Sequence, residues 1–317
     1  MKYPVLGKIE NLDGDQTIFF KRSLEYIKAK SYDVKYPTLM IPDLFPVSTE
    51  AGEGAASITY EQFDSVGVMK FISDYADDLP RSDVKGKQFT IPVQSLGGSY
   101  GWSMQEIRSA AMANRPLQAM RAVAARRSND QMANKIGWFA DGTAKWAGLT
   151  GVLYNANITK AAAPTGAWLT GPKTPTLIIA DISYCINKII ELTNGVEAAD
   201  TVLLPQLQYA HIAVTPRETG TDTTILEFCR RVFPGVTFAG VNELKDVNPH
   251  PRTGALSNVN CMLAYRRSPD HLQVETPVIF EQFPAQERNL AYMIPTHSRQ
   301  AGFNIYYPIS LHLVDGL

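Results

Sequence analysis

The sequence has little cysteine, almost no net charge and no long apolar run. Its 317 residues include three cysteines, Cys185, Cys229 and Cys261, which lie far apart in apolar or helical stretches. They offer neither CxxC metal-ligand spacing nor a disulfide framework, so we expect buried thiols. No run of about 18 apolar residues is present, and the N-terminal MKYPVLGKIENLDG lacks the apolar segment of a signal peptide. These absences predict a protein that is made and kept in the cytosol, without membrane contact.

Charge of either sign is also scarce. Charged residues make up 19% of the chain, below the roughly 25% of an average soluble domain. The 30 Lys and Arg nearly cancel the 31 Asp and Glu, so a global attraction to nucleic acid is excluded and any such contact is local. Because 45% of the residues are apolar, a sizeable core is expected, and oligomerisation explains the low surface charge most simply.

One short motif suggests catalysis. Gly97, Ser99 and Gly101 match GxSxG, the nucleophile elbow of serine hydrolases. An elbow follows several parallel strands and enters its helix at once, whereas here a helix is expected only from the Ser103 cap. The five histidines are isolated, with no obvious acidic partner at a recurring spacing: His211, His250, His271, His297 and His312. We therefore interpret LGGSYG as a glycine-rich turn and keep a hydrolase as a minor alternative.

No other motif predicts a site. LGGSYG lacks the third glycine and the βαβ context of a dinucleotide loop. Three carboxylates, Asp74, Asp77 and Asp78, have no histidine nearby and suit a solvated loop better than a metal site. Three arginines are interpreted as solvated or ion-paired rather than phosphate-binding: Arg121, Arg126 and Arg127. The sequence thus predicts no catalytic, cofactor-binding or metal-binding residue and no enzyme.

The N-terminal third is predicted to be extended. Residues 1–49 carry four prolines, which suits an arm with one helix at about Gln16 to Lys30. Within that arm KYPTLMIPDLFPV is apolar but broken by proline, so neither a helix nor a central strand is expected, and it should lie across another surface. The stretch from ITYEQF to FTIPV predicts the strands of a long hairpin with a charged, turn-rich tip.

Two helices are predicted next. Ser103 and Glu106 form a capping box at the start of a short helix. This helix is expected to break near Asn114 and to restart at Pro116 as a strut of about 36 Å that runs to Phe139. Its expected buried side comprises Leu117, Met120, Ala124, Met132 and Ile136.

The remainder has an α/β pattern. An isoleucine stripe with Cys185 predicts a helix, TVLLP a buried strand, and TILEFCRRVFPG a second helix that ends at Pro234 and Gly235. Strands are expected at TFAGV, NCMLAYRR and LQVETPVIF. The C-terminal run RNLAYMIPTHSRQAGFNIYYPISLHLV alternates like a strand pair and is expected to return to the first domain.

The order of these parts, with VGVMKFISDYADDLPRSDV, the strut region YGWSMQEIRSAAMANRPLQAMRAVAARRSNDQMANKIGWFADG, GLTGVLYN and RQAGFNIYYPISL, resembles a known family. It is similar to tailed-bacteriophage major capsid proteins of the Hong Kong ninety-seven (Johnson, encapsulin-like) fold. The resemblance implies an α+β fold with an N-terminal arm at 1–54, an extended loop at 55–100, and a peripheral domain with the strut helix at 101–174. It also implies an axial domain at 175–265 and return strands to the peripheral domain at 266–317.

The same resemblance implies a function. The chain would assemble with itself as pentamers and hexamers into an icosahedral shell, in the host cytoplasm, and would be located in the virion around packaged double-stranded DNA. Scaffolding, portal and decoration proteins are possible further partners. Some relatives cross-link a loop lysine to an asparagine, and Lys85 and Lys87 lie in that region, but no partner asparagine can be chosen. An encapsulin nanocompartment around a cargo enzyme is the alternative.

Overall fold

The structure is a computed structural model that describes residues 37–72, 79–113, 117–169, 173–218 and 220–317. The chain divides into two units, Met1–Thr38 and Leu39–Leu317, and the second is described here. The helix expected at Gln16 to Lys30, the acidic trio around Asp77 and the expected helix break near Asn114 lie outside the described residues.

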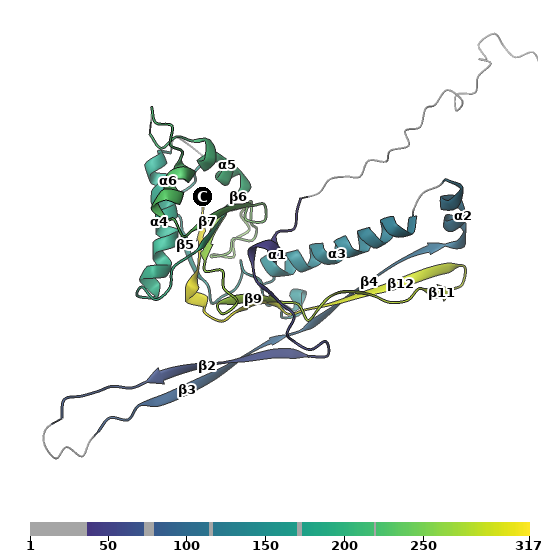
Figure 1. The fold of residues 1–317 in the computed structure, drawn as a ribbon, viewed down its shortest axis with the longest axis horizontal. Coiled ribbons are helices and arrows are strands. Elements are labelled where there is room, and N and C mark those ends of the chain that lie inside the picture. The colour runs from purple at the N-terminus through teal and green to yellow at the C-terminus, as the bar shows by residue number, and fades with distance from the viewer. Residues whose placement is uncertain (1–36, 73–78, 114–116, 170–172, 219) are drawn as a thin grey trace, which may run out of the picture. The chain divides into compact units, whose positions relative to one another are not determined.

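A five-stranded mixed sheet in the order β5-β14-β8-β6-β7 carries the most deeply buried residues (Figure 1). Its strands are β5 (Thr159–Ala162), β14 (Leu311–Asp315), β8 (Cys261–Tyr265), β6 (Thr201–Pro205) and β7 (Thr237–Val241). Strand pairs β5/β14 and β6/β7 are parallel, and β8 is antiparallel to both of its neighbours. The strands expected at TVLLP, TFAGV and NCMLAYRR are thereby confirmed.

Three helices accompany this sheet: α4 (Pro175–Leu192), α5 (Gln206–Val214) and α6 (Ile225–Val232). The apolar stripe of α4 contains Ile182, Cys185 and Ile186, as its spacing predicts, and packs with Val202 and Leu204 of β6. Leu203, between these two strand residues, belongs to a different core cluster. Because successive strand residues point to opposite faces, the sheet separates a core under the helices from a second core on its other side.

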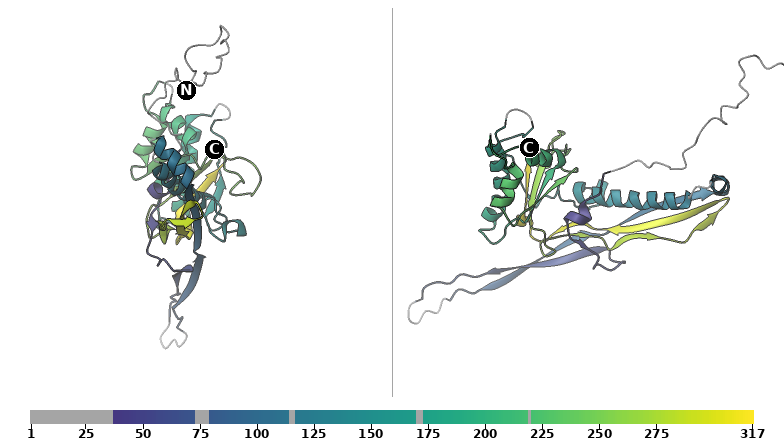
Figure 2. Two further views of the ribbon diagram at one scale, coloured as in Figure 1. Left: turned by 90° about the vertical axis from the view of Figure 1, so that its right-hand side faces the viewer. Right: turned by 45° about the horizontal axis from the view of Figure 1, so that its top comes forward.

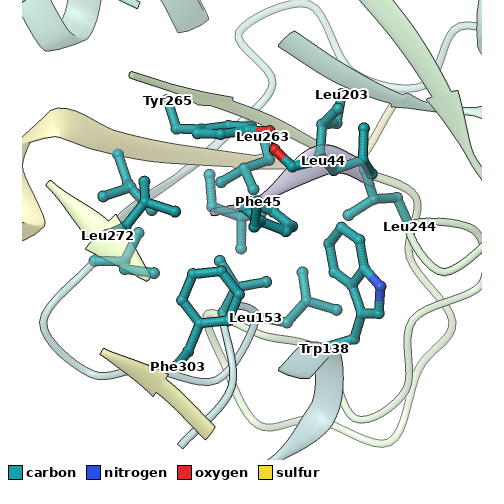
Figure 3. Packing of buried hydrophobic residues seen from close by; sticks show 14 of the residues in the cluster. Leu44, Phe45, Trp138, Leu153, Leu203, Leu244, Leu263, Tyr265, Leu272 and Phe303 are labelled. Carbon is teal, nitrogen blue, oxygen red and sulfur yellow. Dashed lines mark hydrogen bonds between the residues drawn. The ribbon is translucent and has the colours of Figure 1, made fainter. Parts of the chain in front are cut away.

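The second core contains an aromatic group centred on Phe45 (Figure 3). The Phe45 ring centroid lies 5.5 Å from that of Trp138, 4.9 Å from Tyr265 and 4.8 Å from Phe303. The Tyr265 hydroxyl donates a 2.7 Å hydrogen bond to the carbonyl oxygen of Leu44. Burial also raises the pKa of Tyr265, which keeps this hydroxyl a donor.

The expectation for KYPTLMIPDLFPV is wrong in two respects. Residues Ile41–Leu44 form a short helix, α1, with Pro42 in its first turn, where the missing proline N–H has no helical partner to lose. Strand β1 (Val47–Ser48) then pairs in parallel with β9 (Leu272–Glu275) as an edge strand, which agrees with the expectation that this segment supplies no central strand. This segment therefore packs into the core of its own unit, because Ile41, Leu44 and Phe45 are too apolar to remain outside it.

A second sheet lies beside the strut helix, α3 (Leu117–Phe139). Strand β4 (Gln94–Ser103) pairs antiparallel with β12 (Ala291–Gln300) over ten residues. Strands β10 (Val278–Gln282) and β11 (Gln286–Arg288) also pair with β12. Figure 2 shows α3 running lengthwise along β4 and β12.

The remaining described elements are short or extended. Helix α2 (Met104–Met112) follows β4, strand β13 (Gly302–Ile305) pairs with β9, and two 3-10 helices span Ala144–Trp146 and Pro308–Ser310. The predicted hairpin is confirmed as β2 (Ser57–Val66) and β3 (Asp83–Pro92), which pair antiparallel from Ser57 with Pro92 to Val66 with Asp83.

The C-terminal run differs from the expected strand pair. Strand β12 does join the peripheral strand β4, but β14 pairs with β8 and β5 in the five-stranded sheet. All five residues of β14 are buried, and a strand with two buried faces needs a position between two neighbours. Within the described residues, no helix is both long and apolar enough to cross a bilayer.

Candidate assembly surfaces

Ser99 lies in the middle of strand β4, so the interpretation of LGGSYG as a turn is wrong. Its register partner is Pro295, and its hydroxyl forms no hydrogen bond within the described chain. A Cβ on Gly101 would lie 2.3 Å from the Tyr292 carbonyl oxygen, whereas one on Gly97 would meet nothing within 4 Å. The glycine at 101 thus permits close approach to β12, and the motif is a strand feature rather than an elbow.

Three histidines do have acidic neighbours, contrary to the expectation. The distances are 3.1 Å from His271 Nε2 to Glu197, 3.6 Å from His250 Nε2 to Asp315 and 4.0 Å from His297 Nδ1 to Glu281. Sequence could not show these pairs, because each joins residues brought together only by the fold.

Of these histidines, only His297 lies near Ser99, on the same face of the sheet. His297 is the register partner of Gly97 and of Glu281. A nucleophilic serine needs a hydrogen-bonded base, and the exposed, unbonded Ser99 has none in the described chain.

The cysteines are buried and free, as predicted. Burial raises the pKa of Cys229 to about 11 and that of Cys261 to about 12, and it raises the pKa of Cys185 as well. These thiols are therefore protonated and unreactive at neutral pH. Among the described residues, no three His, Cys, Asp or Glu side chains are grouped so as to hold a metal ion.

The start of helix α2 is held by charge and capping. Ser103 accepts from the Glu106 backbone N–H, and the Glu106 carboxylate accepts from the Ser103 backbone N–H, so the predicted capping box is confirmed. Arg121 on α3 reaches the same carboxylate at 2.8 Å. Its hydrogen bond is the main reason that the pKa of Glu106 falls to about 2, with the Ser103 N–H contributing next. Arg121 is thus ion-paired, as expected, and ties α3 to α2.

The buried side predicted for α3 is largely wrong. Ile136 is buried, but Met120, Ala124 and Met132 are exposed. The side that contacts the sheet uses polar anchors instead: Asn129 donates to the Ile279 carbonyl oxygen at 3.1 Å and accepts from the Ser298 hydroxyl. Polar contacts of this kind carry no apolar periodicity, so the sequence pattern could not reveal them.

A group of apolar side chains on the hairpin is exposed, and we call it the hairpin surface. No side chain of β2 or β3 is fully buried. Met69 is 95% exposed and Phe71 is fully exposed. The members of the hairpin surface are Phe63, Val66, Val68, Met69, Phe71, Ile72, Leu79 and Val84. Apolar exposure on this scale marks a contact site for another molecule.

The base of the same hairpin is attached to the rest of the unit. The Tyr60 ring stacks on Phe89 at 5.2 Å and meets Tyr306 edge-on at 4.9 Å. The Tyr60 hydroxyl donates to the carbonyl oxygen of Ile305 at 3.3 Å. These contacts fix the base of the hairpin to its own subunit.

A pocket of about 540 Å³ lies between α1, α3 and the strands around β9 and β10. Apolar side chains form much of its lining, including Ile41, Val47 and Val274. Asn129, Asp130 and Asn134 of α3 add polar groups. The sequence does not predict this pocket, because its lining comes from segments far apart in the chain. The apolar run LMIPDLFPV is the one part of the lining with a visible sequence pattern, and that pattern predicts an arm segment.

Comparisons with known proteins agree with this geometry. The capsid of Myoviridae phage XM1 has a TM-score of 0.84 and 20% identity, covering 95% of this chain and 99% of that chain. The capsid of the native GTA particle has a TM-score of 0.61 and 8% identity, covering 92% and 94%. The capsid of cyanophage P-SCSP1u has a TM-score of 0.60 and 12% identity, covering 92% of both chains. At these identities the likeness shows the fold, which is the α+β Hong Kong ninety-seven-like fold that the sequence predicts.

Sequence comparison supplies the family. No curated protein sequence matches significantly. A family model described as major capsid protein matches residues 67–317, which include most of the hairpin surface, the strut helix and both sheets. The chain therefore belongs to the major capsid protein family.

Proposed function

We propose that this chain is the repeating subunit of the head of a tailed bacteriophage. Copies would assemble as pentamers and hexamers into an icosahedral shell in the host cytoplasm, and the mature shell would enclose double-stranded DNA in the virion. Family membership supports the capsid role. The observation that carries assembly is the hairpin surface, which no residue described in its own subunit covers.

The magnitude of that exposure favours assembly. Fully burying one large apolar side chain contributes about 1.5 to 3 kcal/mol, so the hairpin surface offers roughly 10 to 20 kcal/mol of gross stabilisation per subunit. Most of it is offset by the entropy lost on association. Because each subunit makes several such contacts in a closed shell, multivalency makes the whole assembly stable even though each single contact is weak.

We assign each part of the fold to one of the domains that the family resemblance implies. The part of the arm that precedes Leu39 and the loop at 55–100 would contact neighbouring copies, the strut helix would stiffen the peripheral domain, and the helix-covered sheet would form the axial domain. Since the chain has a formal net charge of −1, contact with packaged DNA would be confined to local patches of the surface and would not depend on base sequence. Scaffolding, portal and decoration proteins are candidate further partners of this assembly.

Electron microscopy of the purified protein tests the proposal. Uniform closed shells, with DNA inside those recovered from infected cells, are the expected result. Deleting residues 1–38, which leaves the compact unit intact, should give a folded subunit that does not close into stable shells. Ser99→Ala should assemble like the wild type. A monodisperse monomer at high concentration, or loss of shells with Ser99→Ala alone, would contradict the proposal.

A further inference from the structure

Three buried polar atoms lie near the junction between helix α3 and the segment that follows strand β7. They are Asn134 Oδ1 and Trp138 Nε1 on α3 and Glu243 Oε2 after β7, and none of them has a hydrogen-bond partner within the described chain. Asn134 is 7% exposed and Trp138 is fully buried. Since an unpaired polar atom in the interior is costly, native proteins pair such atoms with protein groups or with ordered water.

Several contacts bring these atoms to one place. Asn134 Nδ2 donates to Glu243 Oε1 at 2.7 Å, so the unpaired oxygens of the two side chains are close together. Asn134 and Trp138 are four residues apart on α3, which puts their side chains on the same face of the helix. Trp138 also packs in one core cluster with Leu244, the residue after Glu243. Its indole nitrogen lies on the side of the ring away from Phe45 (Figure 3), so one small site is within reach of all three unpaired atoms.

The chemistry of the three atoms selects the occupant of this site. The indole N–H only donates, whereas the amide and carboxylate oxygens only accept. A flipped Asn134 amide would place its oxygen against the Glu243 carboxylate, so the orientation of the amide is fixed by that contact. The occupant must therefore accept one hydrogen bond and donate two. A water molecule does both, whereas a metal ion or an ammonium group has no lone pair for the indole N–H.

We propose that an ordered water molecule binds here, accepts from Trp138 Nε1, and donates to Asn134 Oδ1 and Glu243 Oε2. Three hydrogen bonds are typical of a buried water. Asn134 also lines the pocket of about 540 Å³, so the site borders a space that is large enough for solvent. The water joins the strut helix to the end of β7 by polar contacts and so fixes α3 relative to the helix-covered sheet. This inference concerns the single subunit and does not rest on the proposed shell function.

An experimental structure at a resolution that shows ordered waters tests the site directly. We expect a density peak at about 2.7 to 3.2 Å from all three atoms. Trp138→Phe keeps an aromatic ring in the core but removes the donor, so the peak should weaken or vanish while the hydrogen bond between Asn134 and Glu243 remains. The proposal is overturned by a wild-type structure without the peak, by a peak that is unchanged in Trp138→Phe, or by a peak at the shorter distances of a metal ion.

A double-mutant cycle on the unfolding midpoint in urea gives a second readout. Trp138 Nε1 and Glu243 Oε2 form no direct hydrogen bond, so coupling between Trp138→Phe and Glu243→Gln would report the water that they share. The double variant should lose less than the sum of the two single losses. Glu191→Gln is the matched control, because this carboxylate lies on α4 with a side chain that is 68% exposed, and its loss should add to that of Trp138→Phe. Additive losses for Trp138→Phe with Glu243→Gln would contradict the shared water.

Discussion

The helix-covered sheet and the β2–β3 hairpin differ in whether their apolar side chains are buried within the subunit. Every residue of β6, β8 and β14 is buried within the subunit. The hairpin strands are twice as long, yet they bury no side chain completely. Apolar content is high in both TVLLP and VGVMKFI, so composition alone does not decide burial. Burial depends on whether the surrounding elements belong to the same chain or to a neighbour.

Replacing one phenylalanine in each region should give the largest difference in the free energy of unfolding. Phe45→Ala removes a fully buried ring from the aromatic group and should lower the free energy of unfolding by about 3 to 5 kcal/mol. Phe71→Ala removes an exposed ring and should change it by less than about 0.5 kcal/mol. Urea denaturation of unassembled subunits measures both values.

Assembly should show the reverse order. Phe71→Ala subunits should fold normally but form fewer shells at a given concentration, as measured by sedimentation. If Phe71→Ala destabilises the isolated subunit as much as Phe45→Ala does, the hairpin packs within its own chain and the comparison fails.

A second prediction concerns acid stability in the sheet region. His312 on β14 is fully buried, its Nδ1 lies 3.1 Å from the Thr159 carbonyl oxygen, and burial lowers its pKa to about 4. In the unfolded chain the imidazole titrates near 6.5, so between these values the unfolded state binds the extra proton and the folded state does not. The His312 contribution is therefore present above pH 6.5 and falls by about 2 kcal/mol at pH 5, and by somewhat more near pH 4.

Urea denaturation at pH 7 and pH 5 checks the sign and the size. His312→Gln should reduce the loss of stability between these two pH values, even if it lowers stability at both. An unchanged pH dependence in this variant would show that other groups cause the acid sensitivity.

The smallest expected effect concerns the outlying helix α2, which has no buried residue. It is held by its cap and by the Arg121–Glu106 ion pair, and Ser103→Ala should cost about 1 kcal/mol by removing the cap. The variant should show faster amide hydrogen exchange in residues 104–112 and unchanged exchange in α4. Equal exchange in α2 of both proteins would mean that packing on α3, rather than the cap, holds this helix.

The sequence predicts an element correctly where the residues that form the pattern are close in the chain and contact one core or one another. The isoleucine stripe predicts α4 because Ile182, Ile186 and Ile189 face a single core, although Ile190 is exposed. The capping box predicts the start of α2 because both hydrogen bonds lie within four residues. The hairpin was predictable for a similar reason, since its two strands are close in sequence and pair only with each other.

The errors arise where distant segments decide the outcome. LGGSYG becomes a strand because β12, almost 200 residues later, pairs with it along its whole length. The apolar residues Met120 and Met132 predict a buried stripe on α3, but both are exposed, and the polar side chain of Asn129 anchors the helix to the sheet. The pocket beneath α1 escaped residue-level prediction for the same reason, since it draws its lining from several segments.

The position of Phe45 also determines how many N-terminal residues can be cleaved off before the core is disrupted. Cleavage up to Thr38 leaves the compact unit whole, whereas cleavage a few residues further would remove the peptide group that accepts the Tyr265 hydroxyl and the ring on which Trp138 packs. We therefore expect exopeptidase digestion from the N-terminal side to slow near Leu39, because further cleavage would have to open the buried aromatic group centred on Phe45.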